Sequence, residues 1–208
     1  PAKEEDDAAA RAELMALSSG DFDGDLLRQL LDSSRSRKNK GDVFVQPFTK
    51  ACSEIVKLMS SLGRAFEFAG TDMNDKLSVM RRRSGETAAE LKITDADVTI
   101  QQMVQREIKA GTTHAGKKAA GASRTVVRLL WLLDFIAVLL TKLADQPRAD
   151  LSSVISATYE ETLAPRHIWV LRRIVRSGMS LVPDNSTFLS KRKLDKLSEA
   201  EQVAKLRS

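Results

Sequence analysis

One long apolar segment limits what this chain can fold into. It runs from Ser123 to Leu140 and reads SRTVVRLLWLLDFIAVLL. Its apolar part, from Val126 onward, is 15 residues long and contains two charged side chains, whereas a helix that crosses a bilayer needs about 20 residues with few charges. We therefore predict a soluble protein in which this segment is a buried central helix, capped by Ser123 and ending near Asp145.

Two arginines interrupt one face of this helix. Arg124 and Arg128 are four residues apart, so they lie one above the other, and the same stripe continues through Trp131 and Phe135. The face is therefore cationic at one end and apolar along the rest. Burying an unpaired guanidinium is costly unless an anion meets it. Either these side chains are solvated at the helix start, or an anionic ligand binds there.

Helical spacing continues on both sides of this segment. In PFTKACSEIVKLMSSLGRAFEFAG, which begins at Pro47, apolar residues recur every three or four positions, and Gly70 is expected to end that helix. A new helix is then predicted in TDMNDKLSVMRRR, with Thr71 or Asp72 near its first turn. The following SGETAAELK is expected to be a loop.

Shorter helices complete the expected fold. Thr94 or Asp95 would cap the helix in TDADVTIQQMVQREIKAG, and Pro165 would open the helix after ADLSSVISATYEETLA. Because no alternating strand pattern of useful length appears, we predict an all-α fold of about eight helices. Residues 1–22, acidic and rich in alanine, are predicted to form a flexible extension, and residues 23–208 a single domain.

Composition limits the kinds of binding partner and the cellular compartment that we expect for this chain. The net charge of +5 favours anionic partners, either nucleic acid or acidic lipid headgroups. Aromatic residues make up only 5% and are not interleaved with basic ones, so we expect no nucleic-acid binding. The single cysteine, Cys52, fits a reducing compartment, and the start PAKEEDD lacks a secretory pattern, so a cytoplasmic protein is expected.

Two further polar features stand where core or cap residues are expected. Asp72 and Lys76 are one helical turn apart after an apolar segment, and His167 lies in LAPRHIWVLRR. Asp72 and Lys76 could be an ordinary surface ion pair, worth about 0.3–0.5 kcal/mol. His167 could be a satisfied core or capping imidazole. Taken singly, neither feature identifies a site.

Three segments together resemble the signature blocks of the glycolipid transfer protein superfamily. They are GRAFEFAGTDMNDKL, GASRTVVRLLWLLDFI and ATYEETLAPRHIWVLRR, and the resemblance extends roughly from Asp25 to Phe188. It implies a two-layer helical sandwich, the GLTP fold, with one lipid pocket. It also implies a protein that carries one sphingolipid between membranes without a chemical step. No cofactor, metal or enzymatic activity is expected, and we expect a monomer that contacts membranes transiently, as a peripheral protein.

The resemblance also indicates the headgroup. Family members that bind sugars have tryptophan at the position of Arg128 and no cation at that of Arg124, whereas members that carry ceramide-1-phosphate have arginine at both. Asp72 followed by Lys76 is likewise the phosphate-type spacing. By resemblance, Lys76, Arg124 and Arg128 would hold the phosphate. Asp72 would accept a hydrogen bond from the sphingolipid amide N–H, and His167 would donate one to the amide carbonyl oxygen.

Apolar side chains are expected to line a tail pocket and to contact the membrane. Trp169 resembles the family tryptophan at the membrane contact, although it could instead pack internally against Trp131 or another helix. Four candidates for the tail lining, with plain core packing as their alternative, are Phe68, Leu132, Phe135 and Leu139.

The sequence alone leaves other functions open. A glycosphingolipid carrier, or a module that senses lipid for protein partners, would need the same kind of pocket. A lipid hydrolase using His167 and Asp72 is disfavoured because the chain has no Gly-x-Ser-x-Gly elbow, glycine-rich phosphate loop or histidine-rich metal motif. The other histidine, His114, lies in the predicted loop TTHAG, and Cys52 has no adjacent base.

Overall fold

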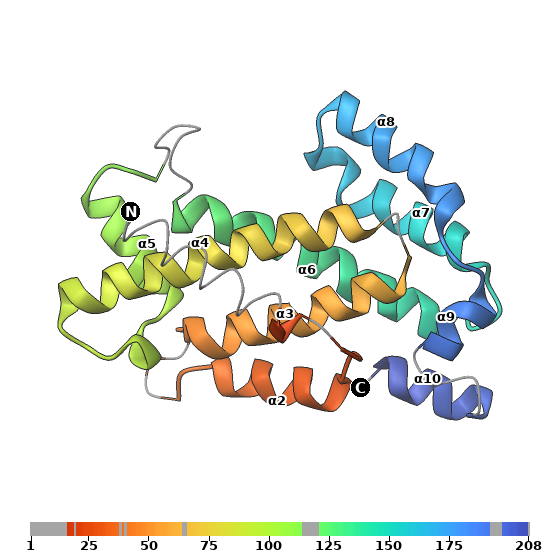
Figure 1. Ribbon diagram of the computed structural model, residues 1–208, viewed down its shortest axis with the longest axis horizontal. Helices are drawn as coiled ribbons and strands as arrows, with labels where there is room; N and C mark the ends of the chain where they lie inside the picture. Colours follow the sequence, from red (N-terminus) through yellow and green to blue (C-terminus); the bar gives the residue numbers. More distant parts are fainter. Residues whose placement is uncertain are drawn as a thin grey trace. The chain divides into compact units, whose positions relative to one another are not determined.

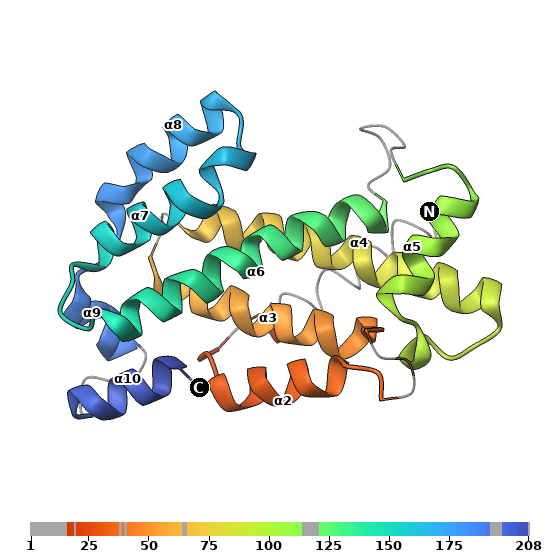
Figure 2. The same cartoon turned by 180° about the vertical axis from the view of Figure 1, so that it is seen from behind.

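A computed structural model describes residues 16–18, 20–37, 39, 41–63, 66–113, 121–191 and 197–207 of the chain (Figures 1 and 2). In this described part the regular elements are helices, with two isolated β-bridges that pair Arg35 with Val43 and Phe44 with Thr99. The predicted all-α class is confirmed. None of the helices in these ranges has the length and apolarity needed to span a bilayer.

The predicted N-terminal extension falls mostly outside these ranges, because residues 1–15 and 19 are not described. At its described end, the hydroxyl of Ser18 donates a hydrogen bond to Asn74 Oδ1 at 3.0 Å. The rest of the chain divides into two compact units. The described residues of Pro1–Lys57 and Thr71–Leu129 form unit 1, and those of Leu58–Gly70 and Leu130–Ser208 form unit 2.

Unit 1 holds the N-terminal helices. It contains α2 (Gly24–Ser34), most of α3 (Val45–Ser61), most of α4 (Glu67–Leu91), α5 (Ile100–Lys109) and the start of α6 (Ala122–Asp145). The backbone N–H of Asp23, at the start of α2, donates to the buried carboxylate of Glu54 on α3 at 3.2 Å, which ties these two neighbouring helices together (Figure 1). The core of unit 1 includes the buried side chains Val45, Phe48, Met73, Leu77, Met80, Met103 and Leu129.

Unit 2 holds the remainder of α6 and the C-terminal helices. These are α7 (Leu151–Thr162), the 3₁₀ turn η3 (Ala164–Arg166), α8 (Trp169–Gly178), the 3₁₀ turn η4 (Met179–Leu181), α9 (Asn185–Lys191) and α10 (Glu199–Arg207). Phe135 of α6 stacks on Phe66 with their ring centroids 6.3 Å apart. Other buried core residues are Leu58, Leu62, Ile136, Leu139, Leu151, Ile155, Tyr159 and Phe188.

The helix break predicted at Gly70 is wrong. Helix α3 ends at Ser61 and α4 begins at Glu67, so Gly70 lies inside α4. The chain turns at Gly63 instead, which has a φ of +92° that residues with a side chain rarely adopt. A Cβ at Gly63 would also lie 3.0 Å from Cδ of Pro183. The tertiary contact, as well as the backbone conformation, therefore requires glycine at this turn.

Three other predicted boundaries are also wrong. The segment SGETAAELK is not a loop, because all of it except Lys92 forms the last turns of α4. Helix α5 is capped by Thr99, which forms a capping box with Gln102, and not by Thr94 or Asp95. Pro165 opens the 3₁₀ turn η3, and α8 begins only at Trp169.

Candidate functional site

In unit 1, Asp72 and Lys76 form an ion pair along α4. The Nζ of Lys76 contacts the carboxylate of Asp72 and lies 3.4 Å from the backbone oxygen of the same residue. The two side chains differ in exposure, at 15% for Lys76 and 56% for Asp72. The ammonium group is therefore largely covered, whereas the carboxylate stays accessible as a hydrogen-bond acceptor.

Unit 1 also contains Arg124 and Arg128, on the first two turns of α6, and both side chains are exposed. In the part of the chain that the structure describes, neither guanidinium makes a hydrogen bond or an ion pair. Cations near a helix N-terminus oppose the helix dipole, and like charges four residues apart repel each other. The start of α6 thus carries a positive charge that a bound anion would offset.

A buried carboxylate holds the start of α6. Glu107 of α5 is 6% exposed, and its two oxygens accept hydrogen bonds from the backbone N–H groups of Ala122, at 2.5 Å, and Ser123, at 2.9 Å. Such N–H groups have no partner within the helix, and negative charge near them is favourable. The predicted Ser123 cap is therefore wrong: Glu107 supplies the cap, and the buried Ser123 hydroxyl has no hydrogen-bond partner in the described part.

Gly121 makes room for the Glu107 carboxylate. A Cβ at Gly121 would lie 2.7 and 2.9 Å from the two carboxylate oxygens, closer than real Cβ contacts allow. Sequence reasoning missed both residues. The one available signal was a glycine directly before the central helix, and it does not indicate which acidic residue approaches.

In unit 2, His167 follows η3 and is half-buried. Its Nδ1 lies 3.0 Å from the hydroxyl oxygen of Tyr159 on α7, and the two ring centroids are 5.7 Å apart. Tyr159 is the only tyrosine of the chain. Burial raises the pKa of its phenol, and the charge of Glu160 raises it further. The sequence prediction included the histidine but not this partner, which lies two helical turns earlier in the chain.

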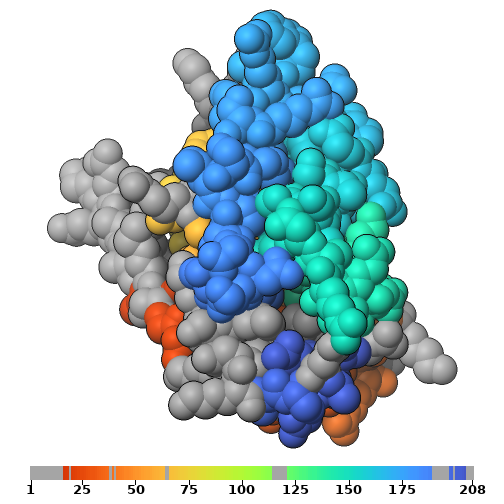
Figure 3. Space-filling model, turned by 90° about the vertical axis from the view of Figure 1, so that its right-hand side faces the viewer, coloured from red at the N-terminus to blue at the C-terminus, as the bar shows by residue number. Residues whose placement is uncertain are grey.

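Trp169 lies on the surface of unit 2. Its side chain is 69% exposed, so the alternative that it packs internally against Trp131 is wrong. Trp131 instead has the guanidinium of Arg166 over its ring, 5.6 Å from the centroid. Two more large apolar side chains of this segment, Ile168 and Ile174, are also exposed. Figure 3 shows the face of unit 2 on which α7 and α8 meet the solvent.

The four candidates for the tail lining are placed differently. Phe135 and Leu139 are buried in unit 2, and Leu132 is partly buried. Phe68 is 71% exposed and takes no part in that core. A role for these four side chains in lining a tail pocket stays a prediction.

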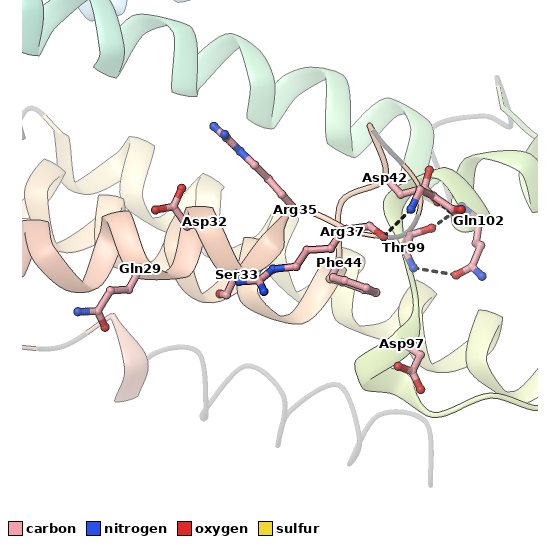
Figure 4. Close-up of a pocket in the computed structure, with 12 residues that line it drawn as sticks. Gln29, Asp32, Ser33, Arg35, Arg37, Asp42, Phe44, Asp97, Thr99 and Gln102 are labelled. Atoms are coloured by element: carbon pink, nitrogen blue, oxygen red, sulfur yellow. Dashed lines mark hydrogen bonds between the residues drawn. The ribbon is translucent and has the colours of Figure 1, made fainter.

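A polar cavity of about 780 Å³ lies elsewhere in unit 1 (Figure 4). It contains none of the predicted site residues, and it is lined by Gln29, Asp32, Ser33, Arg35, Ser36, Arg37, Asn39, Asp42, Phe44, Asp97, Thr99 and Gln102. Its charged side chains are of both signs, and those of Arg35 and Arg37 point in different directions. The cavity therefore has no group of side chains that converge on one ligand.

Metal ligands and Cys52 are the groups of the described part of the chain that bear on catalysis. No cluster of three or more His, Cys, Asp or Glu side chains there could hold a metal ion. Cys52 is buried, and burial raises the pKa of its thiol, which disfavours the nucleophilic thiolate. His114 lies outside the described residues.

Comparison with known proteins gives consistent matches. The family model described as Glycolipid transfer protein (GLTP) matches residues 43–193. The ceramide-1-phosphate transfer protein of Danio rerio is 29% identical over 168 residues, which cover 78% of this chain and 77% of that protein. Accelerated cell death 11 of Arabidopsis thaliana is 28% identical over 166 residues, which cover 79% and 72% of the respective chains.

Solved structures match over most of the chain. The apo-form of Arabidopsis ACD11 aligns with a TM-score of 0.67 at 25% identity and covers 93% of this chain and 89% of that chain. Human ceramide-1-phosphate transfer protein in complex with 12:0 ceramide-1-phosphate aligns with a TM-score of 0.70 at 24% identity, covering 89% and 86%. This likeness confirms the fold that the sequence resemblance implies.

The contact between Gly121 and Glu107 predicts opposite effects for two glycine substitutions. Gly121→Ala is expected to lower the free energy of unfolding by about 1–3 kcal/mol, because the new methyl group must displace the capping carboxylate.

Gly85→Ala is the matched control, since Gly85 lies inside α4 and nothing would approach its Cβ within 4 Å. It should raise the free energy of unfolding by about 0.5–1 kcal/mol. Urea unfolding followed by circular dichroism measures both, and a Gly121→Ala protein as stable as the parent would contradict this role of Glu107.

Proposed function

This chain belongs to the glycolipid transfer protein family, and from that premise we propose that it binds ceramide-1-phosphate and carries it between membranes without altering it. The ceramide-1-phosphate transfer proteins among its relatives support this choice of lipid. The observation that carries the proposal is the pair of exposed arginines at the start of α6, which have no anionic partner in the described part of the chain.

A phosphate monoester matches this pair chemically. It carries nearly two negative charges and three strong acceptor oxygens. Arginine binds such a group with paired, charge-assisted hydrogen bonds that also fix its orientation. In this proposal Arg124 and Arg128 hold the headgroup phosphate, and Lys76 adds a third positive charge. A neutral sugar would leave the same cations without compensation, so the pair selects against glycosphingolipids.

The sphingolipid amide is assigned to Asp72 and His167. The exposed carboxylate of Asp72 accepts a hydrogen bond from the amide N–H, and the imidazole of His167 donates one to the amide carbonyl oxygen. The exposure of Asp72 supports its part, because Lys76 pairs with the carboxylate without enclosing it. Recognition of both the phosphate and the amide would distinguish a phosphosphingolipid from an ordinary glycerophospholipid.

Carriage requires that the lipid leave its membrane, and α8 is the proposed docking element. Each acyl CH₂ moved into water costs about 0.8 kcal/mol, so the carrier must accept the tails directly from the bilayer. Trp169 is suited to the membrane interface because its ring is apolar and its N–H is polar. The exposed Arg173 on the same helix would add attraction to anionic lipids. We propose that the protein acts as a cytoplasmic monomer that is peripheral to membranes.

Removing either arginine is expected to impair transfer without unfolding the protein. Arg124→Ala and Arg128→Ala should each slow transfer of a fluorescent ceramide-1-phosphate between vesicles by about 10- to 100-fold, because each loses charge-assisted hydrogen bonds. Both side chains are exposed, so the free energy of unfolding should change by less than about 0.5 kcal/mol. Arg28→Ala, which removes an exposed arginine from α2, is the control and should transfer normally. Full transfer in both site variants would refute the proposal.

The same assay separates the alternative functions. Unlabelled galactosylceramide should fail to compete, and competition equal to that of ceramide-1-phosphate would identify a glycolipid carrier instead. Mass spectrometry of the lipid after incubation should find it unchanged, and a product of different mass would identify an enzyme.

Replacing Trp169 should weaken membrane binding. Trp169→Ala is expected to reduce binding to sedimented anionic vesicles roughly tenfold, because the interface loses one large apolar contact. Thermal stability should hardly change, since the side chain is exposed. Leu91→Ala, which truncates an exposed leucine at the end of α4, serves as the control and should bind like the parent. Undiminished binding by Trp169→Ala would exclude this residue from docking.

A further inference from the structure

The contact between Tyr159 and His167 determines more than packing. We propose that Tyr159 is a positioning residue: its phenol donates a hydrogen bond to Nδ1 of His167 and so holds the neutral imidazole with its proton on Nε2. Nε2–H is then the group that donates to the sphingolipid carbonyl oxygen, a step that rests on the proposed function. The contact itself joins the hydroxyl oxygen and Nδ1 over 3.0 Å.

The direction of this hydrogen bond follows from counting donors. A neutral imidazole has one N–H and one acceptor nitrogen, and a phenol has one O–H. If Nδ1 carried the proton and donated to the phenol oxygen, the phenol hydrogen would need a second acceptor. Tyr159 is only 2% exposed, and in the described part of the chain its hydroxyl has no other hydrogen-bond partner. The reverse direction would therefore bury an unsatisfied donor, which folded proteins avoid.

The surroundings of Tyr159 keep its proton in place. Burial raises the pKa of the phenol, and the neighbouring Glu160 raises it further, with Arg176 and Arg172 acting in the opposite direction. Glu160 is itself held by Arg176 through two hydrogen bonds, at 2.7 and 2.8 Å. The phenol thus stays a donor at neutral and mildly alkaline pH, where an ordinary histidine side chain is neutral.

The backbone of His167 is anchored as well. Its N–H donates to the carbonyl oxygen of Ala164 at 3.2 Å, which closes the 3₁₀ turn η3. The ring is then fixed at Nδ1 by Tyr159, which lies on the regular helix α7. A hydrogen bond at one imidazole nitrogen is a common way to select the tautomer and orientation of the other. With two anchors, the Nε2–H donor is oriented before the lipid arrives.

The test is ¹⁵N NMR of the histidine side chains in the ligand-free 208-residue chain, at a pH at which imidazole is neutral. His114 is the only other histidine, so a His114→Gln variant assigns the signals of His167. We expect the His167 Nδ1 to resonate as an unprotonated nitrogen and Nε2 as a protonated one. In Tyr159→Phe this pattern should shift toward a mixture of the two tautomers. A protonated Nδ1 in the parent, or an unchanged pattern in the variant, would overturn the proposed hydrogen bond.

The effect of Tyr159 on lipid binding is tested by measuring transfer. Tyr159→Phe should slow ceramide-1-phosphate transfer about 5- to 10-fold, the effect of a weakened hydrogen bond. Thr158→Val is the matched control, because it removes another buried hydroxyl from α7, one that bonds only the Val154 carbonyl oxygen at 2.8 Å. It should change neither the tautomer nor transfer.

The outcomes distinguish this inference from the proposed function. Normal transfer by Tyr159→Phe, together with a changed tautomer, would overturn the positioning role. A parent protein that moves no ceramide-1-phosphate would refute the proposed function and the carbonyl contact with it. The NMR result would then still decide whether Tyr159 sets the tautomer of His167.

Discussion

Positive charge at the start of α6 is the constraint that explains the placement of Glu107 and Gly121 in unit 1. Arg124 and Arg128 lie one turn apart where the helix dipole is itself positive, so this end of α6 is electrostatically unfavourable by itself. Glu107 compensates the backbone N–H groups from beneath while leaving the arginine side chains exposed. The helix start is thus stabilised without neutralising the two guanidinium groups, which is what a reversible anion site requires. Gly121 follows from the same constraint, because only glycine leaves space for that carboxylate.

In unit 2 the polar group of interest is the imidazole of His167, and its surroundings differ from those of the two arginines. His167 is held on one side by a buried phenol and along its backbone by a tight turn. Apolar side chains next to it in the chain, Ile168 and Trp169, are left exposed although unit 2 has a core that could bury such groups. Exposed large apolar side chains on one segment are typical of surfaces that contact another apolar phase. A held imidazole next to exposed apolar side chains would suit the proposed recognition of a lipid as it leaves the bilayer.

Much of the fold could be predicted because helical periodicity is local. The central helix, its end at Asp145 and the all-α class follow from the spacing of apolar residues. Boundaries were predicted less well wherever distant residues decide them. Gly70 resembles a helix breaker, yet the chain turns at Gly63, where Pro183 approaches. Ser123 resembles a cap, yet a carboxylate sixteen positions earlier takes that role. Local preference is weak enough that one such contact overrides it.

The sequence by itself determined which side chains are available for the proposed lipid recognition and in what helical register they stand. Four-residue spacing places Arg124 over Arg128 and Asp72 over Lys76 in any α-helix, because that register is a property of the helix. Only the tertiary structure decided which of these charges are covered, what caps α6 and which nitrogen of His167 faces Tyr159. These features depend on residues that are distant in sequence or on another helix, and helical periodicity does not specify which helices meet.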